Sequence, residues 1–132
     1  MANLYEIFSG EELKIAEKIQ RRRYQMLVHS YIYYEMNENI ISDSQWSRWA
    51  MELVDLQSQY PNISAKVIYA EDFADWDGSS GAFLIYTDKP NIVFTANRLW
   101  RNSIRKQNPV SVVPQPKKPL INKTGSTKKK LF

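Results

Sequence analysis

Two tyrosines, an aspartate and a tryptophan have the residue types and the spacing to bind a ligand that contains a planar ring. Tyr33 and Tyr34 end one predicted helix, while Asp43 and Trp46 lie three residues apart at the start of the next and so share a face. Aromatic faces stack on a base, and a carboxylate accepts hydrogen bonds from ribose hydroxyls. The set predicts a nucleotide-type site at the mouth of a hairpin; packing of the aromatic side chains in the hairpin core is the alternative.

Two predicted helices position these residues. Ser9 opens an S-x-x-E capping box, and a helix without an internal proline is expected over about residues 10–36. A polar turn at residues 37–39 follows, and a second capping box at Ser42 begins a helix that is expected to end near Tyr60. Because the connection is short, the two helices should form an antiparallel hairpin over about residues 10–60.

The remainder of the predicted domain is less regular. Residues 61–88 read as an irregular segment. Residues 66–69 are interpreted as either a short strand or a loop, and residues 82–86 are apolar enough for an edge strand. A third helix, capped by Asp88, is expected over about residues 89–106. Its expected buried residues are Val93, Ala96, Trp100 and Ile104. The predicted fold class is mainly α, with one domain over residues 1–108 and a flexible basic tail over residues 109–132.

The positive charge of the chain is concentrated in this tail. The 132 residues carry a net charge of +4, yet residues 109–132 contain six lysines and no acid. That leaves twelve basic against fourteen acidic residues in the predicted domain, which is therefore slightly acidic. Such a tail can attract nucleic acid by releasing counterions, and a solubilising end is the alternative. The residues predicted to contact nucleic acid or a partner are Lys117, Lys118, Lys128, Lys129 and Lys130.

Several classes of chemistry are excluded or disfavoured. The chain contains no cysteine, so a cysteine nucleophile is excluded. His29 is the only histidine, so a Ser-His pair could be built only with this residue, which we expect to be packed. The acids at residues 71–77 lack the spacing of a calcium loop, so no metal site is predicted. No apolar run is long enough to span a membrane and no secretory signal precedes the helices, so a cytoplasmic protein is expected.

The order of motifs in the hairpin resembles the small N-terminal domain of bacterial NAD-dependent DNA ligases. The resemblance rests on H-x-Y-x-Y-Y, I-S-D-x-x-W-x-R and E-L-x-x-L-x-x-x-Y-P, within about residues 14–62. It implies recognition of the nicotinamide mononucleotide (NMN) half of NAD, with Tyr33, Asp43 and Trp46 as contacts. Tyr34 stands where the family has a histidine and Ser47 where it has a second aspartate, which predicts weaker binding of the mononucleotide.

The chemistry of a ligase is not expected. Adenylation requires the lysine of a K-x-D-G motif as nucleophile, and the only D-G pair, at Asp77, is preceded by Asp75 in the lysine position. The chain is similar to stand-alone ligase-related proteins of phages and mobile elements. Because the binding set is incomplete and no catalytic residue is present, we expect a non-enzymatic protein without a cofactor that docks on a host replication, repair or defence protein. Two alternatives stay open: an NMN- or NAD-binding module, and an accessory protein that binds nucleic acid through its tail. The sequence does not indicate an oligomeric state.

Overall fold

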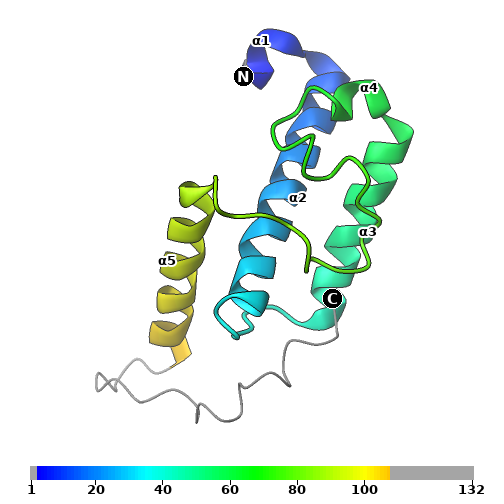
Figure 1. Cartoon of the computed structure of the whole chain (residues 1–132). Helices are drawn as coiled ribbons and strands as arrows, with labels where there is room; N and C mark the ends of the chain where they lie inside the picture. Colours follow the sequence, from blue (N-terminus) through cyan, green and yellow to red (C-terminus); the bar gives the residue numbers. More distant parts are fainter. Residues whose placement is uncertain (1–2, 108–132) are drawn as a thin grey trace.

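A central helix with one long helix on either side makes up most of the computed structural model, in which residues 3–107 are described (Figure 1). The central helix is α2 (Gly10–Tyr34). Helix α3 (Asp43–Gln59) returns along one side of it, and α5 (Pro90–Gln107) lies on the other. Among the described helices, α2 contacts both neighbours, whereas α3 and α5 do not contact each other. The predicted antiparallel hairpin and the mainly α fold class are confirmed.

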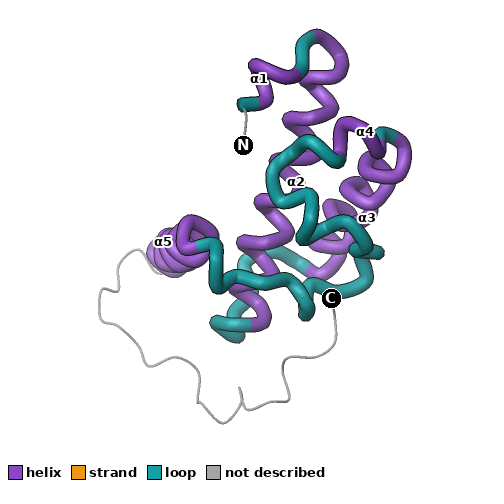
Figure 2. Tube along the Cα trace, turned by 45° about the horizontal axis from the view of Figure 1, so that its top comes forward, coloured by secondary structure: helices purple, strands orange, loops and turns teal. Residues whose placement is uncertain are grey.

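Two single-turn helices complete the described elements. Helix α1 (Leu4–Ile7) packs on the start of α2, and α4 (Pro61–Ser64) contacts both members of the hairpin. Pro61, predicted to stop the hairpin's second helix, also supplies the first residue of α4, where its missing N–H costs no hydrogen bond. Between α4 and α5 the chain runs as turns and loops across the hairpin (Figure 2).

Of the two alternatives for residues 66–69 the loop is correct, and the edge strand at residues 82–86 does not form. Residues 66–69 and 82–86 form turns and irregular backbone, and residues 3–107 contain no strand. In the first segment Tyr69 has a φ of 70°, which no strand accommodates, and the carbonyl groups of Val67 and Ile68 accept hydrogen bonds from Arg23. The backbone carbonyl groups of this short apolar run therefore find their hydrogen-bond donor in a side chain of α2 and not in a neighbouring strand.

The helix boundaries largely follow the predicted caps. Ser9 and Ser42 are the N-cap residues of α2 and α3, but only Ser42 accepts a backbone hydrogen bond, from the N–H of Gln45 at 3.0 Å. Asp88 does not cap α5. The carbonyl of Lys89 accepts the first helical hydrogen bond, while the Asp88 carboxylate pairs with the Lys89 ammonium at 2.9 Å.

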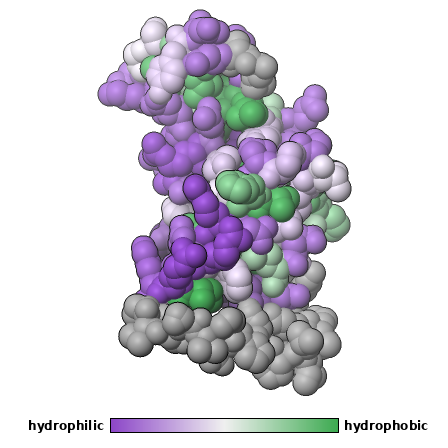
Figure 3. Space-filling model, turned by 90° about the vertical axis from the view of Figure 1, so that its left-hand side faces the viewer, coloured by the Kyte–Doolittle hydropathy of each residue, from purple (hydrophilic) through white to green (hydrophobic). Residues whose placement is uncertain are grey.

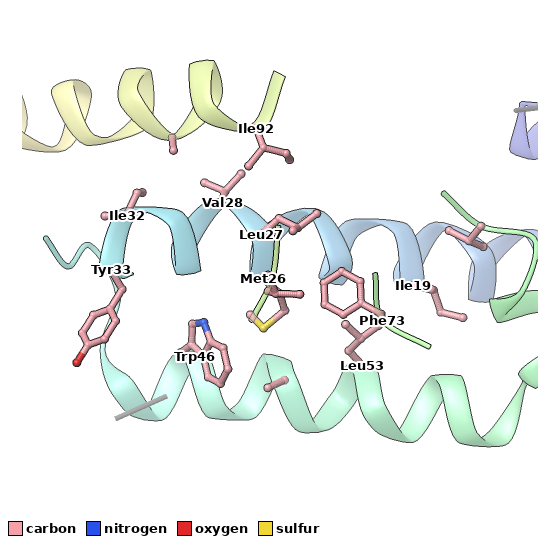
Figure 4. Packing of buried hydrophobic residues seen from close by; sticks show 14 of the residues in the cluster. Ile19, Met26, Leu27, Val28, Ile32, Tyr33, Trp46, Leu53, Phe73 and Ile92 are labelled. Carbon is pink, nitrogen blue, oxygen red and sulfur yellow. The ribbon is translucent and has the colours of Figure 1, made fainter. Parts of the chain in front are cut away.

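The core lies on both faces of α2. Toward α3 it joins Met26 and Leu53 with Phe73 from the connecting loop, and toward α5 it joins Val28 with Ile92 (Figure 4). The predicted buried face of α5 is only partly right. Ile92 and Ala96 are fully buried and Leu99 packs against the core, whereas Val93 and Trp100 are half-buried and Ile104 is 37% exposed. Relative to the prediction, the buried face of α5 is shifted by about one residue, so that the buried i, i+4, i+7 series starts at Ile92 and not at Val93.

Within residues 3–107 no helix is both long enough and apolar enough to cross a bilayer. The predicted tail and its five contact lysines lie outside the described residues.

Candidate ligand site at the hairpin mouth

The hairpin mouth is where the end of α2 meets the start of α3, and it holds the predicted aromatic residues. Tyr33 and Tyr34 are 7% and 9% exposed, and Trp46 is 1% exposed. The two tyrosine rings meet edge to face with centroids 4.8 Å apart. Figure 4 shows Tyr33 and Trp46 extending from α2 and α3 into the space between the helices. The structure thus brings the three aromatic side chains together, but it buries them in the core.

A segment from the loop before α5 closes the mouth. We refer to residues 76–81 as the cover segment. Trp76 packs edge to face against Trp46 at 5.9 Å, and its indole N–H donates to the carbonyl oxygen of Ser80 at 2.7 Å. The Tyr34 hydroxyl and Ser80 Oγ form a hydrogen bond at 3.2 Å. Two of the side chains predicted to hold a ligand, Tyr34 and Trp46, are therefore in contact with the protein's own loop.

Gly81 lets the cover segment approach α2 closely. A Cβ atom at this position would overlap Ser30 Oγ, lie 2.8 Å from Ser30 Cβ and lie 3.5 Å from Cζ2 of Trp46. The absence of a side chain is required by the space and not by the backbone angle. Gly81 and Trp76 thus lie on the same part of the mouth, beside the indole of Trp46.

The two polar residues of the predicted site lie on the outside. Asp43, in the first turn of α3, and Ser47 are both exposed. Asp43 is still close to one aromatic partner: burial, the neighbouring Tyr34 and the charge of Asp43 together raise the pKa of Tyr33. Ser47 borders an open groove on the outer side of the hairpin, beside Trp49. The structure therefore gathers part of the predicted set and separates Ser47 from it.

His29 is a packed residue, as predicted. Its ring is 9% exposed and lies 5.7 Å from the ring of Trp49. Burial lowers its pKa from the ordinary 6.5 to about 4, so it is neutral at physiological pH.

Two buried cations that fix the loops were not singled out by the sequence analysis. Arg23 is 1% exposed and its guanidinium donates to the backbone carbonyls of Ser64, Val67 and Ile68. Burial lowers its pKa to about 10, so it remains charged. Its neighbour Arg22 pairs instead with Glu52 of α3 at 2.7 Å. The carbonyl contacts of Arg23 had no sequence signal, because backbone acceptors carry no residue identity.

Lys89 is the second buried cation. Its ammonium, 4% exposed, pairs with Asp72 at 2.8 Å and donates to the carbonyl of Ile85 at 2.9 Å. It therefore ties both ends of the connecting loop to the start of α5. In the described part of the chain no three His, Cys, Asp or Glu residues are grouped so that they could hold a metal ion.

The comparisons with known proteins find bacterial DNA ligases. The chain is 30% identical over 50 residues to the DNA ligase of Thermotoga maritima and 35% identical over 49 residues to that of Pseudothermotoga lettingae. These matches cover 38% and 37% of this chain but only 7% of each ligase. A ligase of Thermotoga neapolitana is 30% identical over 59 residues, 8% of its length. No family model and no solved structure matches. A partial resemblance to DNA ligases is thus supported.

Proposed function

We propose that the chain is a non-catalytic DNA-ligase-related interaction protein, encoded by a phage or mobile element, which uses the hairpin as a scaffold and docks on a host replication, repair or defence protein. The observation that carries the proposal is the closed hairpin mouth. Trp76 and Ser80 of the cover segment contact Trp46 and Tyr34, and both of these side chains are buried, so no open ring face is left on which a base can stack. The missing K-x-D-G lysine is a second support for a non-catalytic role.

The same loop presents an apolar anchor to solvent. Phe83 is 91% exposed and Ile85 is 56% exposed, while Leu84 between them is buried. The loop is held on both sides of this group, by the fit of Gly81 against α2 and by the Lys89 hydrogen bond to the Ile85 carbonyl. An exposed aromatic on a loop that is already ordered binds a partner at low entropic cost. Burying such a side chain contributes about 1.5–3 kcal/mol.

Affinity capture from host lysate on the immobilised full chain tests the docking role, with two matched variants. Phe83→Ser removes the anchor, and Met51→Ser removes an apolar side chain that is 52% exposed on α3. We expect one host protein to be retained by the wild-type chain and by Met51→Ser but lost with Phe83→Ser. Retention that is the same on all three chains would refute Phe83 as the anchor, and specific retention on none would refute docking.

A thermal-shift titration with NAD and NMN separates docking from the nucleotide-binding alternative. We expect no change in melting temperature at millimolar ligand, because the aromatic side chains are covered. A rise that is abolished by Asp43→Ala would overturn the scaffold proposal in favour of a nucleotide-binding module. Asp43 is exposed, so its replacement tests the ligand contact without disturbing the core.

A further inference from the structure

The charge of the chain divides sharply at the start of α5. Residues 90–132 hold ten of the eighteen Lys and Arg residues and none of the fourteen acids. Residues 1–89 therefore carry eight basic against fourteen acidic side chains. The basic region is consequently longer than the tail, since it includes the whole of a folded helix, with Arg98, Arg101, Arg105 and Lys106.

Within α5 the arginines are aligned on one face. Phe94, Arg98, Arg101 and Arg105 follow the i, i+4, i+7, i+11 series and are all exposed. We call these four residues the α5 stripe. It lies opposite the face that Ile92 begins and that packs on α2. The Arg98 guanidinium lies 5.7 Å from the centre of the Phe94 ring. Figure 3 shows the most hydrophilic side chains of this side of the molecule gathered over α5.

Among the described residues, the arginines of the stripe have no counter-charge, in contrast to Lys18, Arg22 and Lys89. Lys18 and Arg22 share Glu52, and Lys89 pairs with two aspartates. Within residues 3–107 no carboxylate lies at ion-pair distance from the stripe. Three adjacent like charges repel one another and contribute nothing to the packing of α5. An external anion would reduce this electrostatic repulsion, which no carboxylate of residues 3–107 offsets.

We propose that the α5 stripe binds the phosphate backbone of duplex DNA. The three arginines rise about 10 Å along the helix axis, which equals about three base-pair steps of a duplex and so matches a row of phosphates better than a single anion. Insertion into a membrane surface is disfavoured because the apolar face of α5 is already used against α2, where Ile92 and Ala96 are 0% exposed. The contact is independent of docking through Phe83, which lies on the preceding loop.

The test is fluorescence anisotropy of the full chain on a labelled 20-base-pair duplex between 50 and 200 mM salt. The variant Arg98→Gln/Arg101→Gln/Arg105→Gln removes the three charges of the stripe. Its control, Arg21→Gln/Arg48→Gln/Lys66→Gln, removes three exposed charges from other parts of the surface. Loss of three phosphate contacts lowers the magnitude of the slope of log affinity against log salt by about 2.7. Between 50 and 200 mM salt the affinity of the wild-type chain should therefore fall about 40-fold more than that of the stripe variant.

The outcomes discriminate between the sources of negative charge. Weaker duplex binding and a lower slope for the stripe variant alone, with the control unchanged, support the proposal. Equal weakening by both variants would mean that net charge and not the stripe binds DNA, which overturns it. Competition by poly-glutamate or phosphatidylserine vesicles as effective as by unlabelled duplex, at equal charge concentration, would also overturn it. All substituted residues are exposed, and unchanged melting temperatures verify folding. Phe83→Ser should bind duplex normally, which separates this result from that of docking.

Discussion

Replacing Gly81 by alanine should destabilise the protein by forcing the cover segment away from α2. The added Cβ would overlap Ser30 Oγ and lie 2.8 Å from Ser30 Cβ, and both atoms belong to a buried residue of a long helix that cannot yield easily. Overpacking by one methyl group at a tight site costs about 1–3 kcal/mol. We expect the upper part of this range, about 2 kcal/mol, because the clash includes a carbon atom of a helix. For a domain of this size that lowers the melting temperature by roughly 10 °C.

Urea and thermal unfolding followed by circular dichroism measure this effect. Ala82→Ser is the control, because residue 82 is exposed and contributes to the segment only its backbone N–H, which donates to Ser80 Oγ at 3.0 Å. Adding Ser30→Ala to Gly81→Ala removes the overlap with Oγ and should restore part of the lost stability. If Gly81→Ala unfolds within 0.5 kcal/mol of the wild type, a tolerance typical of neutral surface changes, the mouth is not closed by this segment.

Three further perturbations test the buried charges. Arg23→Met should cost about 3 kcal/mol in urea unfolding, because three backbone carbonyls lose their donor; an unchanged midpoint would contradict the contacts. Lys89→Met should cost about 1 kcal/mol, and the loss should be smaller in a chain that already carries Asp72→Asn; equal losses in both backgrounds would argue against the pair. His29 binds its proton more weakly in the folded state, with a pKa of about 4, so stability should be full above pH 6.5 and fall as the pH decreases toward 4. The decrease is at most about 3 kcal/mol and should be absent in His29→Phe, which urea unfolding at a series of pH values would measure.

The hairpin could be predicted because its signals are local. Capping residues at Ser9 and Ser42, an uninterrupted helical stretch and a short turn all act within a few residues of one another. The rotation of α5 and the turn at residues 66–69 could not be predicted in the same way. The turn depends on hydrogen bonds that Arg23 donates to carbonyl groups more than forty residues further along the chain. The rotation depends on which face of α5 meets α2. Neither contact leaves a periodic pattern in the sequence.

The candidate site shows the same division. Tyr33, Tyr34 and Trp46 belong to one buried cluster, because all three are fixed by the geometry of one hairpin. The sequence could not establish whether they face a ligand, because the answer depends on Trp76, thirty residues further along the chain. An aromatic pocket and an aromatic core require the same residue types at the same helical spacing, and only the long-range contact separates the two.

Asp43 and Trp46 make this limit explicit. They are three residues apart, and the helical period predicts that they share a face, yet Asp43 is exposed and Trp46 is almost fully buried. The rise of the helix places Asp43 at its open end, in the first turn, whereas Trp46 lies deeper, beside Trp76 and Gly81. A carboxylate at that end is favourable with the helix dipole whether or not a ribose is present. The ligase-like order of residues in this hairpin can therefore be maintained by folding alone, and for this reason the two proposals concern surfaces that the fold leaves exposed, at Phe83 and along α5.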